Sequence, residues 1–313
     1  MCAGLPRPVR ATYEAGPTGY GLARELDGRG VGCVVAAPST IPGASGDRVK
    51  IDRRDAELLV RLLPAGKVHP VRVPGPEEEA LRDLTRAREA VRVDLMRCRH
   101  VAAAHGHRFE DAPAWTQRHR DWPAGLELGC PAAQATLLDA SGAIDALTHR
   151  RDRLEREIAA MPPGSPSAVH VGRLRCLRAI DTLTAVGLCA EIADFARFAR
   201  AEHRMSYIGL VPCENTTGAQ RRLGAITNTG SGHARRLLVE AAWHRRKRPA
   251  VPKALAERHD GRPAEAIAIS WSAQQRLHRT WTRLEARAKR RTIIAVAAAR
   301  ELAGFCRAIT RIE

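Results

Sequence analysis

VGCVVAAP, residues 31–38, is the stretch that decides the fold class of the N-terminal region. It is a continuous apolar run rich in valine that ends at a proline, which is typical of a buried strand in a parallel sheet. Parallel strands cannot be joined by a tight hairpin and need a crossover, usually a helix. The stretch therefore predicts an α/β arrangement.

The sequence on either side supplies the other elements of that arrangement. VRATY (9–13) predicts a short strand, LARELDGRG (22–30) a helix that ends at glycine, DRRDAELLVRLL (52–63) a second helix and VHPVRVP (68–74) a last strand. This order favours an α/β domain over residues 1–76. Three strands are few for such a sheet, so we expect a domain that is truncated at its start.

The rest of the chain is predicted to be mostly helical. Long helices over 77–104 and 133–161 are expected to form an antiparallel, coiled-coil-like pair within a helical region of residues 77–161. Residues 162–169 are the predicted linker, because PPGSPSA begins there, and 170–313 form a predicted helical C-terminal domain. Within it, 174–192 is expected to be helix, tight turn and helix, a layout that binds DNA backbone in some proteins, although those turns usually carry glycine.

The charge of the chain favours a polyanionic partner. Its 313 residues include 51 Lys and Arg against 34 Asp and Glu, a net charge of +17, and cations bind nucleic acid by releasing counterions from phosphates. Aromatic anchors for a membrane surface are scarce, at 4% of residues. No stretch approaches the ~20 apolar residues of a membrane span, and no Cys or His cluster has zinc-site spacing. We expect an intracellular, soluble protein.

Two aspartates stand out in KIDRRDA (50–56). Asp52 and Asp55 are three residues apart, so they share one face of the predicted helix. They could hold divalent metal beside a phosphate backbone, or they could be ordinary partners of the helix N-terminus. Glu14 follows a predicted strand, and the carboxyl ends of parallel strands are where α/β sheets place ligands. A third carboxylate there could face the two aspartates.

Several long motifs together resemble one protein family. YEAGPTGYGL (13–22), VVAAPSTIPGASGDRVKIDRRDAELLVRLL (34–63) and EALRDLTRARE (79–89) are followed by IGLVP (208–212), TTG (216–218), QRRLGAIT (220–227), HARRLLVEAAW (233–243) and ARELAGF (299–305). These segments resemble the DEDD transposases of bacterial insertion sequences, which are bridge-RNA-guided recombinases with a RuvC-like domain and a serine-type C-terminal transposase domain. The resemblance covers nearly the whole chain.

The resemblance implies a fold and a set of roles. The fold would be a truncated RNase H-like (RuvC-like) α/β domain, a long helical middle and a helical C-terminal transposase domain. Glu14, Asp52 and Asp55 match the second, third and fourth acids of a tetrad that binds Mg²⁺, and the first acid would lie upstream of Met1. Thr217 stands where the family has a nucleophilic serine. The expected partners are DNA, a structured guide RNA and further copies of the chain, as a dimer or tetramer.

Cations surround the predicted nucleophile. The candidates for nucleic-acid contact are Arg221, Arg222, His233, Arg235 and Arg236, some of which open a predicted helix. Arginines and free amides at a helix N-terminus suit phosphate oxygens. His233 taken alone has the bland alternative of a surface histidine, and Thr216 and Thr217 that of turn residues.

Three functions stay open at this point. The first is a DNA transposase that cleaves and rejoins strands with Mg²⁺ and a hydroxyl nucleophile. The second is a catalytically dead remnant that still binds nucleic acid, because threonine replaces the expected serine and the first acid is not found. The third is a basic helical protein that binds DNA or RNA structurally, in which Asp52 and Asp55 only cap a helix.

Overall fold

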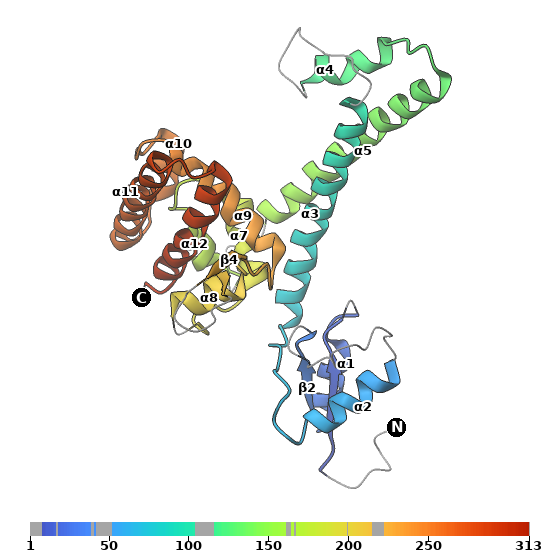
Figure 1. The fold of residues 1–313 in the computed structure, drawn as a ribbon, viewed down its shortest axis with the longest axis vertical. Coiled ribbons are helices and arrows are strands. Elements are labelled where there is room, and N and C mark those ends of the chain that lie inside the picture. Colours follow the sequence, from blue (N-terminus) through green and yellow to red (C-terminus); the bar gives the residue numbers. More distant parts are fainter. Residues whose placement is uncertain are drawn as a thin grey trace. The chain divides into compact units, whose positions relative to one another are not determined.

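The computed structural model describes residues 8–16, 18–38, 41, 52–103, 116–160, 164–165, 167–198, 200–214 and 222–312. The chain divides into two compact units, Met1–Glu77 and Glu78–Glu313, here called the N-terminal and C-terminal units. The first is α/β and the second is mostly helical (Figure 1). The α/β-plus-α expectation is confirmed at this level, whereas the RNase H-like character of the N-terminal unit stays a prediction.

The N-terminal unit is built on two parallel strands. β1 (Arg10–Glu14) pairs with β2 (Gly32–Ala36) from Arg10 opposite Gly32 to Glu14 opposite Ala36. Helix α1 (Gly21–Gly28) forms the crossover and packs on β2. Helix α2 (Asp52–Leu62) packs on β1. The β-branched run 31–38 thus forms the strand that it predicts, and its residue Val35 is buried.

The predicted strand 68–74 forms an isolated β-bridge instead of a strand. Within the described residues, its one bridge is antiparallel and joins Pro70 to Ala36. Two backbone hydrogen bonds hold it there, from Ala37 N to the His69 oxygen at 3.0 Å and from Val71 N to the Val35 oxygen at 2.8 Å. Proline has no N–H for a strand ladder, so Pro70 and Pro74 limit this segment to an edge contact. The expectation of a full third strand is wrong.

The C-terminal unit begins with an antiparallel helix pair. α3 (Pro76–Ala103) and α5 (Pro131–Ala159) run past each other, with α4 (Gln117–Asp121) and the short 3₁₀ helix η3 (Trp122–Gly125) between them in sequence (Figure 1). Leu81 packs with Ile158, and Arg88 forms an ion pair with Glu155. The expected pair of charged helices is present.

The remaining elements form a compact helical body. They are α6 (Ala168–Leu174), α7 (Thr182–Ile192), α8 (Ala201–Tyr207), β3 (Pro212–Glu214), β4 (Leu223–Ile226), α9 (Gly232–Trp243), η4 (His244–Arg246), α10 (Lys253–His259), α11 (Ala264–Ala286) and α12 (Arg291–Thr310).

Helix α12 is the centre of this body. It packs against α6, α8, α9 and α11, and its sequence IIAVAAARELAGFC (293–306) is apolar on most sides. Small residues such as Ala295, Ala298 and Ala299 are fully buried, which lets neighbouring helices approach closely. A helix with apolar residues on most of its surface is expected to lie inside a domain.

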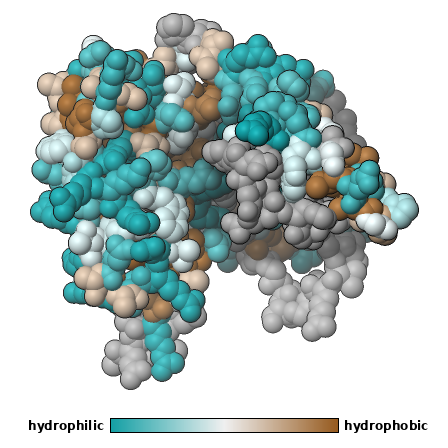
Figure 2. All heavy atoms as spheres, turned by 90° about the horizontal axis from the view of Figure 1, so that it is seen from above, coloured by the Kyte–Doolittle hydropathy of each residue, from teal (hydrophilic) through white to brown (hydrophobic). Residues whose placement is uncertain are grey.

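One face of the molecule can be described by its hydropathy. On the face drawn in Figure 2, hydrophilic side chains predominate and hydrophobic ones form small separate patches. No helix in the described part of the chain combines the length and apolar character that crossing a membrane requires.

Candidate functional site

The three acids predicted to bind metal lie in the N-terminal unit. Glu14 ends β1, in register with the last residue of β2, so it lies at the carboxyl edge of the parallel strands. Asp52 and Asp55 occupy the first turn of α2. Carboxylate oxygens are the ligands that Mg²⁺ prefers. Within the residues that the structure describes, however, no three His, Cys, Asp or Glu side chains gather into a group that could hold a metal ion.

The predicted nucleophile belongs to the C-terminal unit. Thr217 lies outside the described residues, as do Thr216 and Arg221. The strands that flank them in sequence, β3 and β4, pair antiparallel, with Pro212 opposite Ile226 and Glu214 opposite Leu223. Arg222, just before β4, is exposed.

Two glycines let the chain before β3 touch the chain after β4. Gly209 has φ +71° and Gly230 has φ +68°, a left-handed conformation that favours glycine. A Cβ on Gly230 would lie 1.8 Å from the Tyr207 oxygen, and one on Gly209 would lie 2.3 Å from the Thr229 oxygen. Gly209 of the IGLVP motif and Gly230 therefore allow a backbone-to-backbone contact at the base of the β3–β4 hairpin.

The guanidinium of Arg235 stabilises the same backbone contact. Its Nη1 donates to the Ile208 oxygen at 2.7 Å and to the Thr229 oxygen at 3.0 Å, and its Nη2 donates to the Asn228 oxygen at 3.3 Å. A guanidinium that serves three backbone carbonyls has few donors left for a phosphate. The structure thus gives Arg235 an internal role, and its predicted contact with nucleic acid is not visible in this geometry.

His233 and Arg236 face inward from α9. His233 is only 11% exposed; its Nδ1 lies 3.4 Å from Glu191 Oε1 and its Nε2 lies 3.9 Å from Glu89 Oε2. Arg236 bonds Glu89 and Glu240, both at 2.6 Å. The bland reading of His233 as a surface histidine is wrong, because two carboxylates enclose it. Both side chains already have carboxylate partners, and their contact with nucleic acid stays a prediction.

Glu191 is the centre of this polar network. The carboxylate is 2% exposed and accepts two hydrogen bonds from Arg86, at 2.8 and 3.0 Å, and one from the Ser231 hydroxyl at 2.9 Å. Burial raises the pKa of Glu191, but the hydrogen bonds from His233, Arg86 and Ser231 outweigh it and lower the pKa to about 2. Glu191 is therefore a buried, ionised anchor that ties α3 to the start of α9.

This anchor was missed in the sequence, although a signal for it exists. TLTAVGLCAEI (182–192) holds a single charged residue within an apolar helix. A lone charge in a buried helix is rare unless it is paired. The sequence could have predicted that Glu191 has cationic partners, but not that one of them is Arg86, 105 residues away.

Known proteins match both units of the chain. The sequence profile of the Transposase IS116/IS110/IS902 family matches residues 172–257. The putative transposase y4qE of Sinorhizobium fredii is 39% identical over 303 residues, which are 96% of this chain and 74% of that relative. The transposase for insertion sequence element IS1533 of Leptospira borgpetersenii is 31% identical over 295 residues, 90% of this chain and 84% of that relative. This chain belongs to the IS116/IS110/IS902 transposase family.

In this IS116/IS110/IS902 family member, the profile match begins in α6 and ends in α10. It therefore includes Glu191, the β3–β4 hairpin and the start of α9. The resemblance noted in the sequence is confirmed at the level of the family. Its finer content, which is the RuvC-like domain, the bridge RNA and the tetrad, stays a prediction.

Proposed function

We propose that this chain is a DNA transposase of an insertion sequence, which binds DNA and catalyses strand cleavage and rejoining. The observation that carries the proposal is family membership, because relatives named as transposases align with 96% and 90% of this chain, including both of its units. A net charge of +17 supports a DNA partner.

The proposed nucleophile is the hydroxyl of Thr217. Its Oγ1 would form a bond to a DNA phosphorus while one P–O bond to a sugar oxygen breaks. That oxygen would take up a proton, and the threonine proton would pass to a base. Attack by the sugar hydroxyl of another strand would reverse the step and rejoin the DNA. Threonine can act as such a nucleophile, although its Cβ methyl group restricts the rotamer.

Glu14, Asp52 and Asp55 are the residues that we propose as Mg²⁺ ligands. The support is their chemistry and their position, since all three are carboxylates, at the end of β1 and at the start of the helix packed on it. When bound, Mg²⁺ would neutralise charge on the phosphate oxygens. Without metal, these carboxylates would repel the phosphates of DNA. They are compatible with bound DNA only if they hold a metal ion.

The proposal includes partners that the resemblance implies. They are the DNA of the element ends and the target, a structured guide RNA, and further copies of the chain in a dimer or tetramer. The N-terminal unit would be RuvC-like. The protein would act in the bacterial cytoplasm, on nucleoid DNA.

A second candidate function is a remnant that binds nucleic acid without catalysis. One observation favours it: in the described part of the chain the three acids do not form a ready group of ligands. A remnant would bind DNA but would form no covalent protein–DNA adduct, with or without divalent metal ions.

Substitution of Thr217 separates the two functions. The chain is mixed with end-labelled DNA of the element ends, together with transcripts of its flanking sequence, and covalent complexes are separated in denaturing gels. An adduct formed by the wild type and by Thr217→Ser, but not by Thr217→Ala, supports the transposase. An adduct that persists in Thr217→Ala overturns the assignment of this nucleophile. No adduct in the wild type or in Thr217→Ser favours the remnant.

A further inference from the structure

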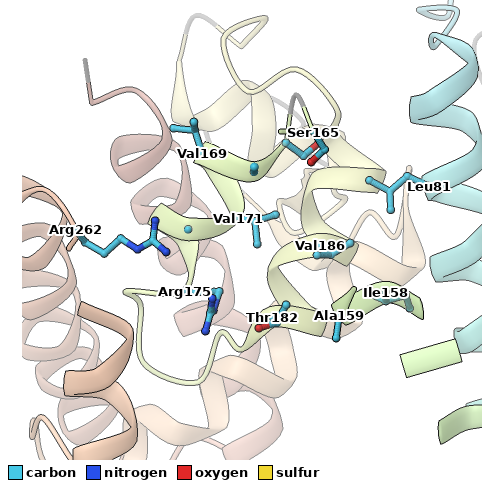
Figure 3. Close-up of a pocket in the computed structure, with 13 residues that line it drawn as sticks. Leu81, Ile158, Ala159, Ser165, Val169, Val171, Arg175, Thr182, Val186 and Arg262 are labelled. Carbon is cyan, nitrogen blue, oxygen red and sulfur yellow. The ribbon is translucent and has the colours of Figure 1, made fainter. Parts of the chain in front are cut away.

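A cavity of about 390 Å³ lies at the junction of α3, α5, α6 and α7. Its two sides differ in chemistry. Leu81, Ile158 and Val186 form an apolar side, and they belong to one small buried cluster. Arg175 and Arg262 lie on the other side (Figure 3). We call this cavity the α6–α7 groove. None of the described residues that line it is acidic.

The two arginines have no carboxylate partner within the described residues. Arg175 Nε is buried without an acceptor there, and Arg262 is exposed. Arg258 adds a third charge, since all three guanidinium groups act on the thiol of Cys176. Elsewhere in this unit, Arg86, Arg88 and Arg236 each pair with a glutamate. Like charges held together without a counter-ion suit an anion.

The Arg262 guanidinium lies directly against the backbone of α6. The Arg262 side chain lies against Gly172 of α6, so closely that a Cβ on Gly172 would be 2.3 Å from Arg262 Nη1. Arg258 is fixed by hydrogen bonds to the Ile180 oxygen at 2.6 Å and to the Ala254 oxygen at 3.1 Å. Asp181, the nearby acid that acts on Arg258, is occupied as the N-cap of α7, where it accepts from Thr184 N at 2.8 Å.

We propose that the α6–α7 groove binds a phosphodiester of the DNA backbone, with Arg175 and Arg262 on the phosphate and the apolar side against the sugar. The identity of the ligand rests on the proposed transposase function. Hydrocarbon side chains suit deoxyribose better than ribose, whose 2′-hydroxyl needs a polar partner. The expectation of a helix, tight turn and helix over 174–192 is wrong, because α6 ends at Leu174 and residues 175–181 are not helical before α7 begins. In this proposal the segment contacts DNA through the Arg175 side chain rather than through turn amides.

Equilibrium DNA binding tests the proposal without catalysis. A fluorescent DNA duplex, its separate DNA strands and RNA of the same sequence are each titrated with the full chain in EDTA, at several NaCl concentrations. Arg262→Ala should weaken binding about tenfold at low salt and reduce the slope of log K against log salt by about one. The control Arg279→Ala removes the same charge from an exposed arginine of α11 that bonds only its own helix, at the Gln275 oxygen.

A glycine substitution tests the geometry. Gly172→Ala should displace only the flexible end of Arg262, so the protein should fold and bind DNA as weakly as Arg262→Ala does. In the Arg262→Ala background, Gly172→Ala should have no further effect. Gly142→Ala is the matched control, because nothing lies within 4 Å of a Cβ on this helical glycine.

The outcomes separate this proposal from the proposed function. If the wild type binds DNA and both Arg262→Ala and Gly172→Ala bind it equally well with unchanged salt slopes, the groove proposal fails and the transposase proposal stands. If both variants lose affinity for RNA of the same sequence but not for DNA, the groove binds RNA and the proposal is overturned. If the wild type itself does not bind DNA, the DNA-binding part of the proposed function fails as well.

Discussion

Replacing Glu191 with glutamine is the sharpest test of the polar network that ties α3 to α9. The change keeps the shape of the side chain but removes its charge, and it places an amide NH₂ against donors from Arg86 and Ser231. Breaking a buried ion pair costs roughly 3–5 kcal/mol. Arg86 is 56% exposed and can be hydrated again, so the low end applies. We expect a loss of about 3 kcal/mol in the free energy of unfolding.

The pH dependence gives a second measure of the same interaction. The pKa of Glu191 falls from 4.5 to about 2 on folding, which corresponds to about 3 kcal/mol of stability above the unfolded pKa. Because the folded pKa is the lower one, this contribution is lost as the pH falls toward 2. The gap between wild type and Glu191→Gln should shrink from about 3 kcal/mol at pH 6 to roughly 1.4 kcal/mol at pH 3.

Urea unfolding followed by tryptophan fluorescence measures both effects. The five tryptophans all follow residue 77, so the signal reports the C-terminal unit. With an m value of about 3 kcal/mol/M, Glu191→Gln should lower the midpoint by about 1 M. Glu257→Gln, at an exposed glutamate of α10, should leave it unchanged. A gap below about 1 kcal/mol at pH 6, or one that stays constant down to pH 3, would refute the reasoning.

Three further predictions follow from the described residues. Gly230→Ala should destabilise the C-terminal unit by more than about 3 kcal/mol, because its Cβ would collide with the Tyr207 oxygen; an unchanged midpoint in urea would contradict this. Arg245→Met should leave stability unchanged or raise it by about 1–2 kcal/mol, because burial lowers the pKa of this guanidinium to about 10 and its Nε and Nη1 have no acceptor within the described residues; a clear loss in the same assay would show that the hydrogen bond from its Nη2 to the Arg178 oxygen, at 2.7 Å, outweighs the cost of burial. Asp52→Asn with Asp55→Asn should abolish recombination of a reporter plasmid but spare DNA binding in EDTA; undiminished recombination would exclude them as metal ligands.

Local sequence signals gave the elements with good accuracy. The valine-rich run 31–38 forms β2, the apolar spacing in 52–63 forms α2, and the periodic stretches 77–104 and 133–161 form α3 and α5. Such signals depend on residues a few positions apart, which side-chain periodicity records directly. The segment 68–74 did not follow its apolar alternation, because its two prolines cannot complete a strand ladder.

The roles of the basic residues near β4 and at the start of α9 could not be predicted in this way. Arg221, Arg222, His233, Arg235 and Arg236 look alike in sequence, as a basic group around a hydroxyl. In the structure, Arg235 serves backbone carbonyls and Arg236 pairs with Glu89, 147 residues away. Whether a cation meets a phosphate or an internal acid depends on what the fold places opposite it.

The sequence by itself determined the family, the approximate limits of α1, α2, α3 and α5, and the excess of positive charge. Motifs and helical periodicity depend on residues close together along the chain, and net charge depends on composition alone. The tertiary structure alone decided which charges are used inside the protein and which are left for a partner. It pairs Arg86 and His233 with a buried Glu191, and it leaves Arg175 and Arg262 at a groove in which no described lining residue is acidic. An unpaired charge is costly to bury. Packing between residues far apart in sequence therefore decides which charged side chains pair inside the protein and which remain available to a ligand.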